Sequence, residues 1–251
     1  MADGLNMIVL ALDSSADTVS VAVLRDDEPL AERSWRMSRP TGRGGPQGGL
    51  LGVADASLAD ARVALAAVEL VAVATGPGSF NGIRAGIAVA EGLALALGVL
   101  AVGVPTLDAL AYQHVGRAGV VCAVLPAGRG EYYGASYTGT WTDWRRRGDY
   151  AVATPADLLG VLPPGALLCG HAAEEVVRLA AEHGLACAPA FSSLARASFV
   201  GALARLRAQD PAFDAHASLQ PLCRRPHVSR GTQTCCMTLW EAFSRQPRLS
   251  R

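Results

Sequence analysis

A glycine-rich segment in the first half of the chain has residue types that can hold an anion. It reads Gly-Pro-Gly-Ser-Phe-Asn-Gly-Ile-Arg from Gly76 to Arg84, between the apolar run 71–74 and a long helical pattern. Glycine allows close backbone approach, and the free N–H groups in the first turn of a helix attract negative charge. The segment therefore predicts either a phosphate contact through Gly76, Gly78 and Ser79, or only close packing of a strand on a helix.

Other residues that could take part in chemistry are spaced in ways that argue against common metal-binding and catalytic sites. No two of the five histidines lie three or four residues apart, so paired ligands on one helix face are not predicted. None of the six cysteines stands in a Cys-x-x-Cys pair, which fits a reduced cytosolic setting. Ser79 lacks the Gly-x-Ser-x-Gly spacing of a nucleophile elbow and is predicted to cap a helix. We expect no catalytic residue and no metal site.

Composition limits the classes of partner. The chain has 251 residues, 51% of them hydrophobic, and its 22 basic residues balance its 22 acidic ones. A net charge of zero gives no overall field for gripping a polyanion, so direct tRNA or DNA binding is not expected. The start of the chain, residues 1–12, lacks the pattern of a signal peptide, and the longest apolar run, residues 93–104, is shorter than a bilayer span. We expect a soluble, cytoplasmic protein without membrane contact.

The pattern of the first half predicts strands, a mobile loop and helices in alternation. Residues 38–49, which carry five glycines and two prolines, are predicted to form the loop. The predicted strands are 7–13, 18–24, 30–37, 69–75 and 99–104, and the predicted helices are 50–58, 83–97 and 105–114.

The predicted helix 83–97 is apolar on all sides and carries only two charges, Arg84 and Glu91. Such a helix is either buried on every side or docks against a helix of a partner. Arg84 would lie in the first turn, where a positive charge opposes the helix dipole and needs a compensating acid. We expect Glu69 or Asp108 to supply it, with an acid or phosphate at a subunit interface as the alternative.

The second half repeats the succession of strands and helices. Residues 120–125 and 132–138 predict a hairpin, followed by a polar segment, 140–150. Within that segment, Arg145 to Arg147 stand beside two tryptophans, which predicts a solvated loop rather than an RNA contact. The remaining predicted helices are 155–161, 174–183 and 194–209, with short strands at 166–169 and 186–188. Two similar halves indicate a duplicated α/β architecture.

Three motifs together resemble the TsaB (YeaZ-type) family of the actin-like, sugar-kinase-like ATPase superfamily. They are the opening run 8–15, the segment 76–84 with the helix after it, and the run 102–110; weaker matches lie at 129–133 and 221–225. The resemblance implies a duplicated actin-like (ribonuclease H-like) two-lobed fold. The predicted division is an N-terminal lobe, 1–110, a smaller C-terminal lobe, 111–228, and a loosely ordered tail, 229–251.

The resemblance also implies a function without catalysis. Members of this family pair with the catalytic paralogue TsaD, and with the ATPase TsaE, to place a threonylcarbamoyl group on the adenosine beside the tRNA anticodon. Contact with tRNA is then expected only through the complex, and a homodimer is an option when the chain is alone. The resemblance places the partner interface on the helix after the glycine motif, at Ile83, Arg84, Ile87, Ala88, Glu91 and Leu95.

It further allows ATP or ADP at the subunit interface, with contacts from Asp13, Ser14, Gly76, Gly78 and Ser79, but implies no intrinsic cofactor. A nucleotide-cleaving member of the superfamily would need an acid at each of two phosphate loops. Asp13 can serve the first, whereas the second offers no carboxylate before Glu131. We therefore expect Asp13 to cap a turn or contact a nucleotide, and we expect no independent ATPase activity.

Three departures from the family pattern leave alternatives open, one of them being Pro126 or Ala127 at the hairpin position where relatives often carry aspartate. The family usually has threonine at position 81, where this chain has Asn81, and a histidine-serine pair with leucines where residues 38–49 offer glycine, proline and arginine. The departure in residues 38–49 alters half of the expected partner surface. The alternatives are a stand-alone nucleotide phosphotransferase of the same superfamily and a self-pairing homodimer without a role in tRNA modification.

Overall fold

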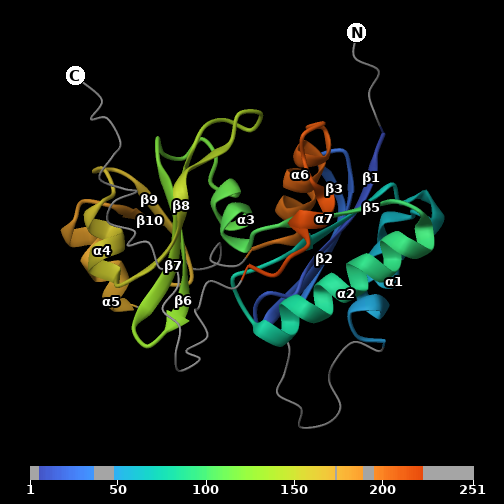
Figure 1. The fold of residues 1–251 in the computed structure, drawn as a ribbon, viewed down its shortest axis with the longest axis horizontal. Coiled ribbons are helices and arrows are strands. Elements are labelled where there is room, and N and C mark those ends of the chain that lie inside the picture. The colour runs from blue at the N-terminus through green and yellow to red at the C-terminus, as the bar shows by residue number, and fades with distance from the viewer. Residues whose placement is uncertain (1–5, 37–47, 173, 189–194, 223–251) are drawn as a thin grey trace, which may run out of the picture.

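The computed structural model describes residues 6–36, 48–172, 174–188 and 195–222, which form two lobes side by side (Figure 1). Each lobe is built on a five-stranded sheet. The predicted α/β, two-lobed fold class is therefore confirmed, and the arrangement of the two sheets explains how distant segments of the chain meet.

The first sheet begins as an antiparallel meander and is extended by parallel strands. Strands β1 (Ile8–Asp13), β2 (Thr18–Arg25) and β3 (Glu28–Arg36) form the meander, and β4 (Leu70–Ala74) and β5 (Leu100–Val104) join beside β1 in parallel. The order across the sheet is β3-β2-β1-β4-β5. Every residue of β1 and β4 is buried, because helices cover both faces, and this explains their unbroken apolar sequences.

The second sheet repeats this topology. Its strands are β6 (Val121–Gly128), β7 (Glu131–Thr138), β8 (Arg145–Ala153), β9 (Leu167–Gly170) and β10 (Ala186–Cys187). Their order is β10-β9-β6-β7-β8, with an antiparallel meander and two parallel strands placed as in the first sheet. The predicted duplication of the architecture is thus seen in the strand order.

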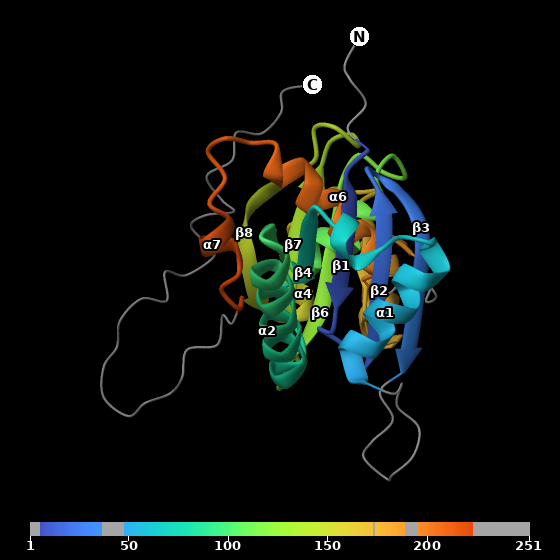
Figure 2. The ribbon, with the colours of Figure 1, turned by 90° about the vertical axis from the view of Figure 1, so that its right-hand side faces the viewer.

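Helices α1 (Gly49–Ala61) and α2 (Phe80–Leu97) cover one face of the first sheet, as Figure 2 shows. Between them lies a short 3-10 turn, η1 (Leu65–Ala67). Alternate residues of β1 point to opposite faces. Leu10 and Leu12 pack under α1 and α2, whereas Val9 and Ala11 pack under α6 (Ala197–Ala208).

Two late helices return to the first lobe. Helix α6 packs against β1, β2, β4 and β5, and α7 (Ala215–Ser218) packs against β5. The predicted division, with residues 111–228 in one C-terminal lobe, does not hold for these helices. Nothing in their own sequence could show this, because an apolar helix face fits any sheet of suitable size. The remaining helices are α3 (Thr106–Tyr112), α4 (Pro155–Gly160) and α5 (Glu174–Glu182).

Several predicted elements need correction. Helix α2 begins at Phe80, not at residue 83, because Ser79 caps it there. The polar segment 140–150 holds most of β8, so Arg145 to Arg147 lie on an edge strand and the prediction of a loop was wrong. Of the predicted loop 38–49, Gly49 begins α1 and residues 38–47 lie outside the described residues, as does the predicted tail 229–251.

Candidate functional site

The glycines of the motif 76–84 pack directly against the turn that follows β1. A Cβ added at Gly78 would overlap the Ser15 carbonyl group, and one added at Gly82 would overlap the carbonyl oxygen of Ser14. A Cβ at Gly86, one turn further along α2, would meet the Ser14 hydroxyl. Glycine is required at these positions because the backbone of another segment already fills the space of a side chain.

Hydrogen bonds hold the two segments together. The Ser79 N–H donates to the Ser15 carbonyl oxygen at 2.6 Å, and the Ser14 hydroxyl donates to the Gly82 carbonyl oxygen at 2.8 Å. The Ser79 hydroxyl accepts from the Gly82 N–H at 3.3 Å, so the prediction that Ser79 caps the helix is confirmed. Two N–H groups near the start of α2 therefore already have protein acceptors, which favours packing over phosphate binding as the role of these glycines.

The residues predicted to contact a nucleotide do lie together, but three of them are covered. Asp13 and Ser14 are buried at the end of β1, and Gly76 is buried beyond β4, whereas Gly78 and Ser79 are exposed. Leu222 closes over the end of β4, where its N–H donates to the Thr75 carbonyl oxygen at 2.8 Å. The predicted contact set is thus a junction of three chain segments.

Asp13 is a buried acid at this junction. Its side chain is 2% exposed and accepts a hydrogen bond from the Ser15 N–H at 2.8 Å. Burial raises the pKa of Asp13 to about 6. Hydrogen bonds from Ser15 lower this pKa, and the nearby Glu32 carboxylate raises it, but both effects are smaller than that of burial. The interpretation of Asp13 as a residue that caps a turn agrees with this geometry.

The equivalent turn in the second lobe carries no acid. It joins β6 to β7 through Gly128, Arg129 and Gly130, with positive φ at all three, and Glu131 is the first residue of β7. A pair of carboxylates facing each other across two phosphate loops is therefore missing from these residues, and they do not fit a Mg²⁺-nucleotide site of that design. Among the described residues, no group of three or more His, Cys, Asp or Glu is arranged to hold a metal ion.

The outer face of α2 forms the second part of the candidate site. Four residues predicted at a partner interface, Arg84, Ala88, Glu91 and Leu95, are exposed and recur at helical spacing on one side. We call the exposed side of this helix the α2 face; its members are Phe80, Asn81, Arg84, Ala85, Ala88, Glu91, Gly92, Leu95 and Ala96.

Two predicted interface residues point the other way. Ile83 and Ile87 are 5% and 7% exposed and belong to the core between α2 and the first sheet, so their assignment to the interface was wrong. The small residues Ala85, Gly92 and Ala96 were missed. Ala85 and Gly92 lie three and four residues from Ala88, and Ala96 lies four residues beyond Gly92, and this helical spacing is the signal that could have identified them.

The α2 face is unusually apolar for exposed surface. Leu95 is 86% exposed and Phe80 is 54% exposed, and the exposed positions between them carry alanine and glycine besides Asn81, Arg84 and Glu91. Leu51, on the neighbouring helix α1, is also half exposed. Large exposed apolar side chains grouped on one surface are typical of a contact with another protein.

Arg84 lies over the ring of Phe80, with its guanidinium carbon 3.8 Å from the ring centre. Since α2 begins at Phe80, Arg84 is in the second turn, not the first. The expected acidic partners were wrong as well. Glu69 accepts a hydrogen bond from the Ile8 N–H, and Asp108 pairs with Arg207.

By length and composition alone, α2 is also the helix in the described part of the chain that could cross a membrane. Its inner side packs on the first sheet, and the core helix of a soluble protein has the same length and composition. This property therefore says little about membranes.

Comparison with known proteins relates the chain to one family. A family model described as TsaD: tRNA N6-adenosine threonylcarbamoyltransferase matches residues 48–234. The tRNA threonylcarbamoyladenosine biosynthesis protein TsaB of Bacillus subtilis is 30% identical over 132 residues, which are 52% of this chain and 55% of that protein. The chain spans about half the length of the curated relatives it matches.

Solved structures extend the likeness over most of the fold. YeaZ from Pseudomonas aeruginosa is 26% identical with a TM-score of 0.69, and the match covers 86% of this chain and 99% of that one. A ROK hexokinase from Thermus thermophilus, 14% identical with a TM-score of 0.51 over 81% of this chain and 100% of that one, shares the fold alone. The chain therefore belongs to the family that the threonylcarbamoyltransferase model describes, and it is a TsaB/YeaZ-type protein with a two-lobed, actin-like fold.

Proposed function

We propose that this chain is a non-catalytic scaffolding and activating subunit in the synthesis of tRNA N6-threonylcarbamoyladenosine, and that it pairs with a TsaD-like catalytic paralogue through the α2 face. The observation that carries the proposal is the exposed apolar surface around Ala88, which has Leu95 and Phe80 at its ends. The family membership and the name of the Bacillus subtilis relative support the pathway.

The residue types on the α2 face suit a partner helix. Alanine and glycine at positions 85, 88, 92 and 96 let a second helix approach closely, and burying Leu95 would remove a large apolar side chain from water. Arg84 and Glu91 provide one charge of each sign on the same face, which can select a partner with opposite charges in register.

The first-lobe turn supports a role without catalysis. Asp13 has no acidic counterpart in the second-lobe turn, and the Ser14 and Ser15 backbone fills the space at the glycine motif. The transfer of the threonylcarbamoyl group would then be catalysed by the paralogue. A TsaE-like ATPase would be a further partner, and tRNA would be bound only through the complex. Binding of ATP or ADP at the interface between this chain and the paralogue stays a prediction from the family resemblance.

The test is a binding measurement with the TsaD-like paralogue of the same organism. We expect Ala88→Arg to weaken binding by about thirtyfold or more, because a long charged side chain would block the centre of the interface. The matched control is Ala181→Arg, the same change on the exposed side of α5 in the other lobe, which should bind like the wild type. Light scattering gives the stoichiometry, and titration calorimetry gives the affinity.

Activity provides a second readout. With purified paralogue, ATPase partner and tRNA, the wild type should stimulate threonylcarbamoyladenosine formation and Ala88→Arg should not. Wild-type protein that neither binds the paralogue nor stimulates it would overturn the proposal. ATP turnover by the chain alone would instead favour a stand-alone phosphotransferase.

One observation favours self-pairing when the paralogue is absent. In an antiparallel pair of α2 helices related by a two-fold axis near Ala88, Arg84 of one copy would lie opposite Glu91 of the other. The α2 face is thus self-complementary in charge. Light scattering of the wild type alone, compared with Ala88→Arg, tests whether this pairing forms and whether the paralogue displaces it.

A further inference from the structure

Helix α3 lies between the two sheets and belongs to both cores. Leu107, Leu110 and Ala111 pack in the core under the second sheet, with residues of β6, β7 and β9. Ala109 and Tyr112, on another side of the helix, pack in the core shared by the first sheet and α6. All residues of α3 are buried. Movement of one lobe relative to the other would therefore disturb at least one face of this helix.

A buried acid on α3 joins the lobes by polar contacts. Asp108 is 5% exposed and accepts hydrogen bonds from the Tyr137 hydroxyl at 2.6 Å and the Tyr150 hydroxyl at 2.7 Å, both from the second sheet. Its other carboxylate oxygen pairs with the Arg207 guanidinium, which comes from α6 on the first sheet. Arg207 also donates to the Gly103 carbonyl oxygen in β5, at 3.1 Å.

These contacts involve chain segments far apart in the sequence and from both lobes. Burial and the Asp108 charge raise the pKa values of Tyr137 and Tyr150, so both phenols stay protonated and act as donors. Separation of the lobes would break the ion pair and both tyrosine hydrogen bonds together and would expose the apolar side chains packed on α3 to water, which is costly.

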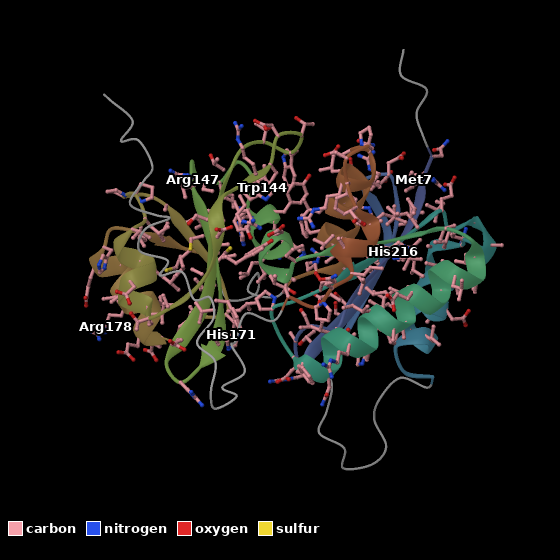
Figure 3. The ribbon with its side chains drawn as sticks, viewed as in Figure 1. Met7, Trp144, Arg147, His171, Arg178 and His216 are labelled. Carbon is pink, nitrogen blue, oxygen red and sulfur yellow. The ribbon has the colours of Figure 1, made fainter. Side chains whose placement is uncertain are left out.

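Aromatic side chains form a layer beside the polar junction. Trp144 stacks on Tyr137, with ring centres 5.6 Å apart and planes 3° apart, and meets Tyr112 edge to face at 6.0 Å. Tyr112 in turn contacts Phe199 on α6 at 6.3 Å. Figure 3 shows Trp144 on the side of the second lobe that faces the first. Through Tyr137, which donates to Asp108, and Phe199, on α6, this layer also joins the second sheet to the first lobe.

We propose that Asp108 is an interlobe lock that holds the two lobes in one orientation, so that this chain moves as a single body and does not close around a ligand by a hinge. Hinge closure requires an interface that opens with little loss of contacts. Opening this interface would instead break the contacts of Tyr137, Tyr150 and Arg207 with the Asp108 carboxylate all at once. A rigid body would present the α2 face without an ordering cost.

The lock predicts a narrow distribution of distances between the lobes. Spin labels at Asp55→Cys on α1 and Ala181→Cys on α5 place one exposed probe in each lobe. The background replaces Cys187, Cys223, Cys235 and Cys236 by serine and keeps the buried Cys122 and Cys169. An excess of unlabelled protein restricts pulsed electron spin resonance to distances within one molecule.

We expect one narrow distribution for the wild type, unchanged by Mg-ATP. Asp108→Asn removes the charge that binds Arg207 and should roughly double the width of the distribution, because a second lobe orientation becomes populated. Tyr137→Phe keeps the stack on Trp144 and removes one hydroxyl donor, so its broadening should be smaller but measurable. It also serves as the test if Asp108→Asn does not fold.

The matched control is Asp60→Asn, which breaks the two-pronged ion pair with Arg33 inside the first lobe. Its distribution should equal that of the wild type. Three outcomes would overturn the lock: a broad distribution in the wild type, a shift on addition of Mg-ATP, or folded Asp108→Asn and Tyr137→Phe proteins with distributions as narrow as the wild type. The last would show that the junction stabilises the fold without restricting the lobes.

Discussion

The two lobes share one strand order but differ in their helices. In the first lobe, α1 and α2 have 13 and 18 residues, whereas the helices in the same places of the second lobe, α4 and α5, have 6 and 9. The longer pair leaves an apolar outer surface. Helix α5 instead has acids at its start and an exposed Arg178–Glu182 pair.

The turns after the first strand of each sheet differ as well. In the first lobe, the turn that follows Asp13 is packed under the start of α2 and held there by hydrogen bonds from Ser79 and Ser14. In the second lobe, β6 and β7 meet in a tight turn through Arg129. Duplication therefore preserved the sheet, while the features that could bind a partner or a ligand diverged between the lobes.

The largest expected effect comes from filling the first-lobe junction. We expect Gly82→Val to lower the free energy of unfolding by about 4 kcal/mol or more, because its Cβ would overlap the Ser14 carbonyl oxygen and the backbone must shift. The control is Gly92→Ala in the same helix, where a Cβ meets nothing within 4 Å. That change should stabilise the protein by about 1 kcal/mol. Denaturant unfolding measures both, and similar effects of the two changes would contradict the packing role of Gly82.

The buried acid of the first lobe should make stability depend on pH. The folded-state pKa of Asp13 is about 6, above its ordinary value of 3.8, so between pH 4 and 6 the folded state holds more protons than the unfolded state. The free energy of unfolding should therefore fall as pH rises through this window, by about 3 kcal/mol in total from this group.

Asp13→Asn should remove that dependence and be more stable than the wild type near pH 7, because the amide oxygen can still accept from the Ser15 N–H and no charge is buried. Asp17→Asn, a change of an exposed acid in the same turn, is the control and should keep the wild-type profile. Denaturant unfolding midpoints of the three proteins, measured at several pH values, test this prediction. Equal profiles for the wild type and Asp13→Asn would show that Asp13 is not the responsible group.

The smallest expected effect concerns the edge strands of the two sheets. Two ion pairs tie strand β3 to its surroundings: Arg33 pairs with Asp60 of α1, and Glu32 pairs with Arg196, the residue just before α6. On strand β8, the Arg146 guanidinium instead lies over the ring of Tyr150 in the same strand, at 3.8 Å. Arg146→Ala should therefore cost about 1 kcal/mol. Arg145→Ala, which loses only an exposed pair with Asp143, should cost less than about 0.5 kcal/mol by thermal unfolding. A larger loss of stability for Arg145→Ala than for Arg146→Ala would contradict this prediction.

Local pattern was sufficient for most of the elements. Apolar runs and alternation located nine of the ten strands in the described part of the chain, and α2 ends at Leu97 as predicted, with Gly98 after it in the left-handed conformation. Strand β8 was missed because Arg145, Arg146 and Arg147 have the composition of a solvated loop. An edge strand can carry such residues, since one side of it faces water and charge there discourages pairing with other chains.

Positions on a helix were harder to predict than the helix itself. Ile83 and Ile87 were expected at the partner surface because the family places an interface on this helix, yet they face the first sheet. The apolar character of α2 alone cannot distinguish its two sides. The sheet beneath it does, because Ile83 and Ile87 fill the core against that sheet while Leu95 remains outside.

The sequence by itself determined the two-lobed α/β class, the family resemblance, the strand-to-helix turn at the glycine motif, and the cap at Ser79. Each of these depends on patterns within short runs of the chain. Tertiary structure alone decided the return of α6 to the first lobe, the covering of the glycine motif by Ser14 and Leu222, and the meeting of Asp108 with Arg207 and the two tyrosines. These contacts join residues separated by tens of positions, and only the packing of both lobes brings them together.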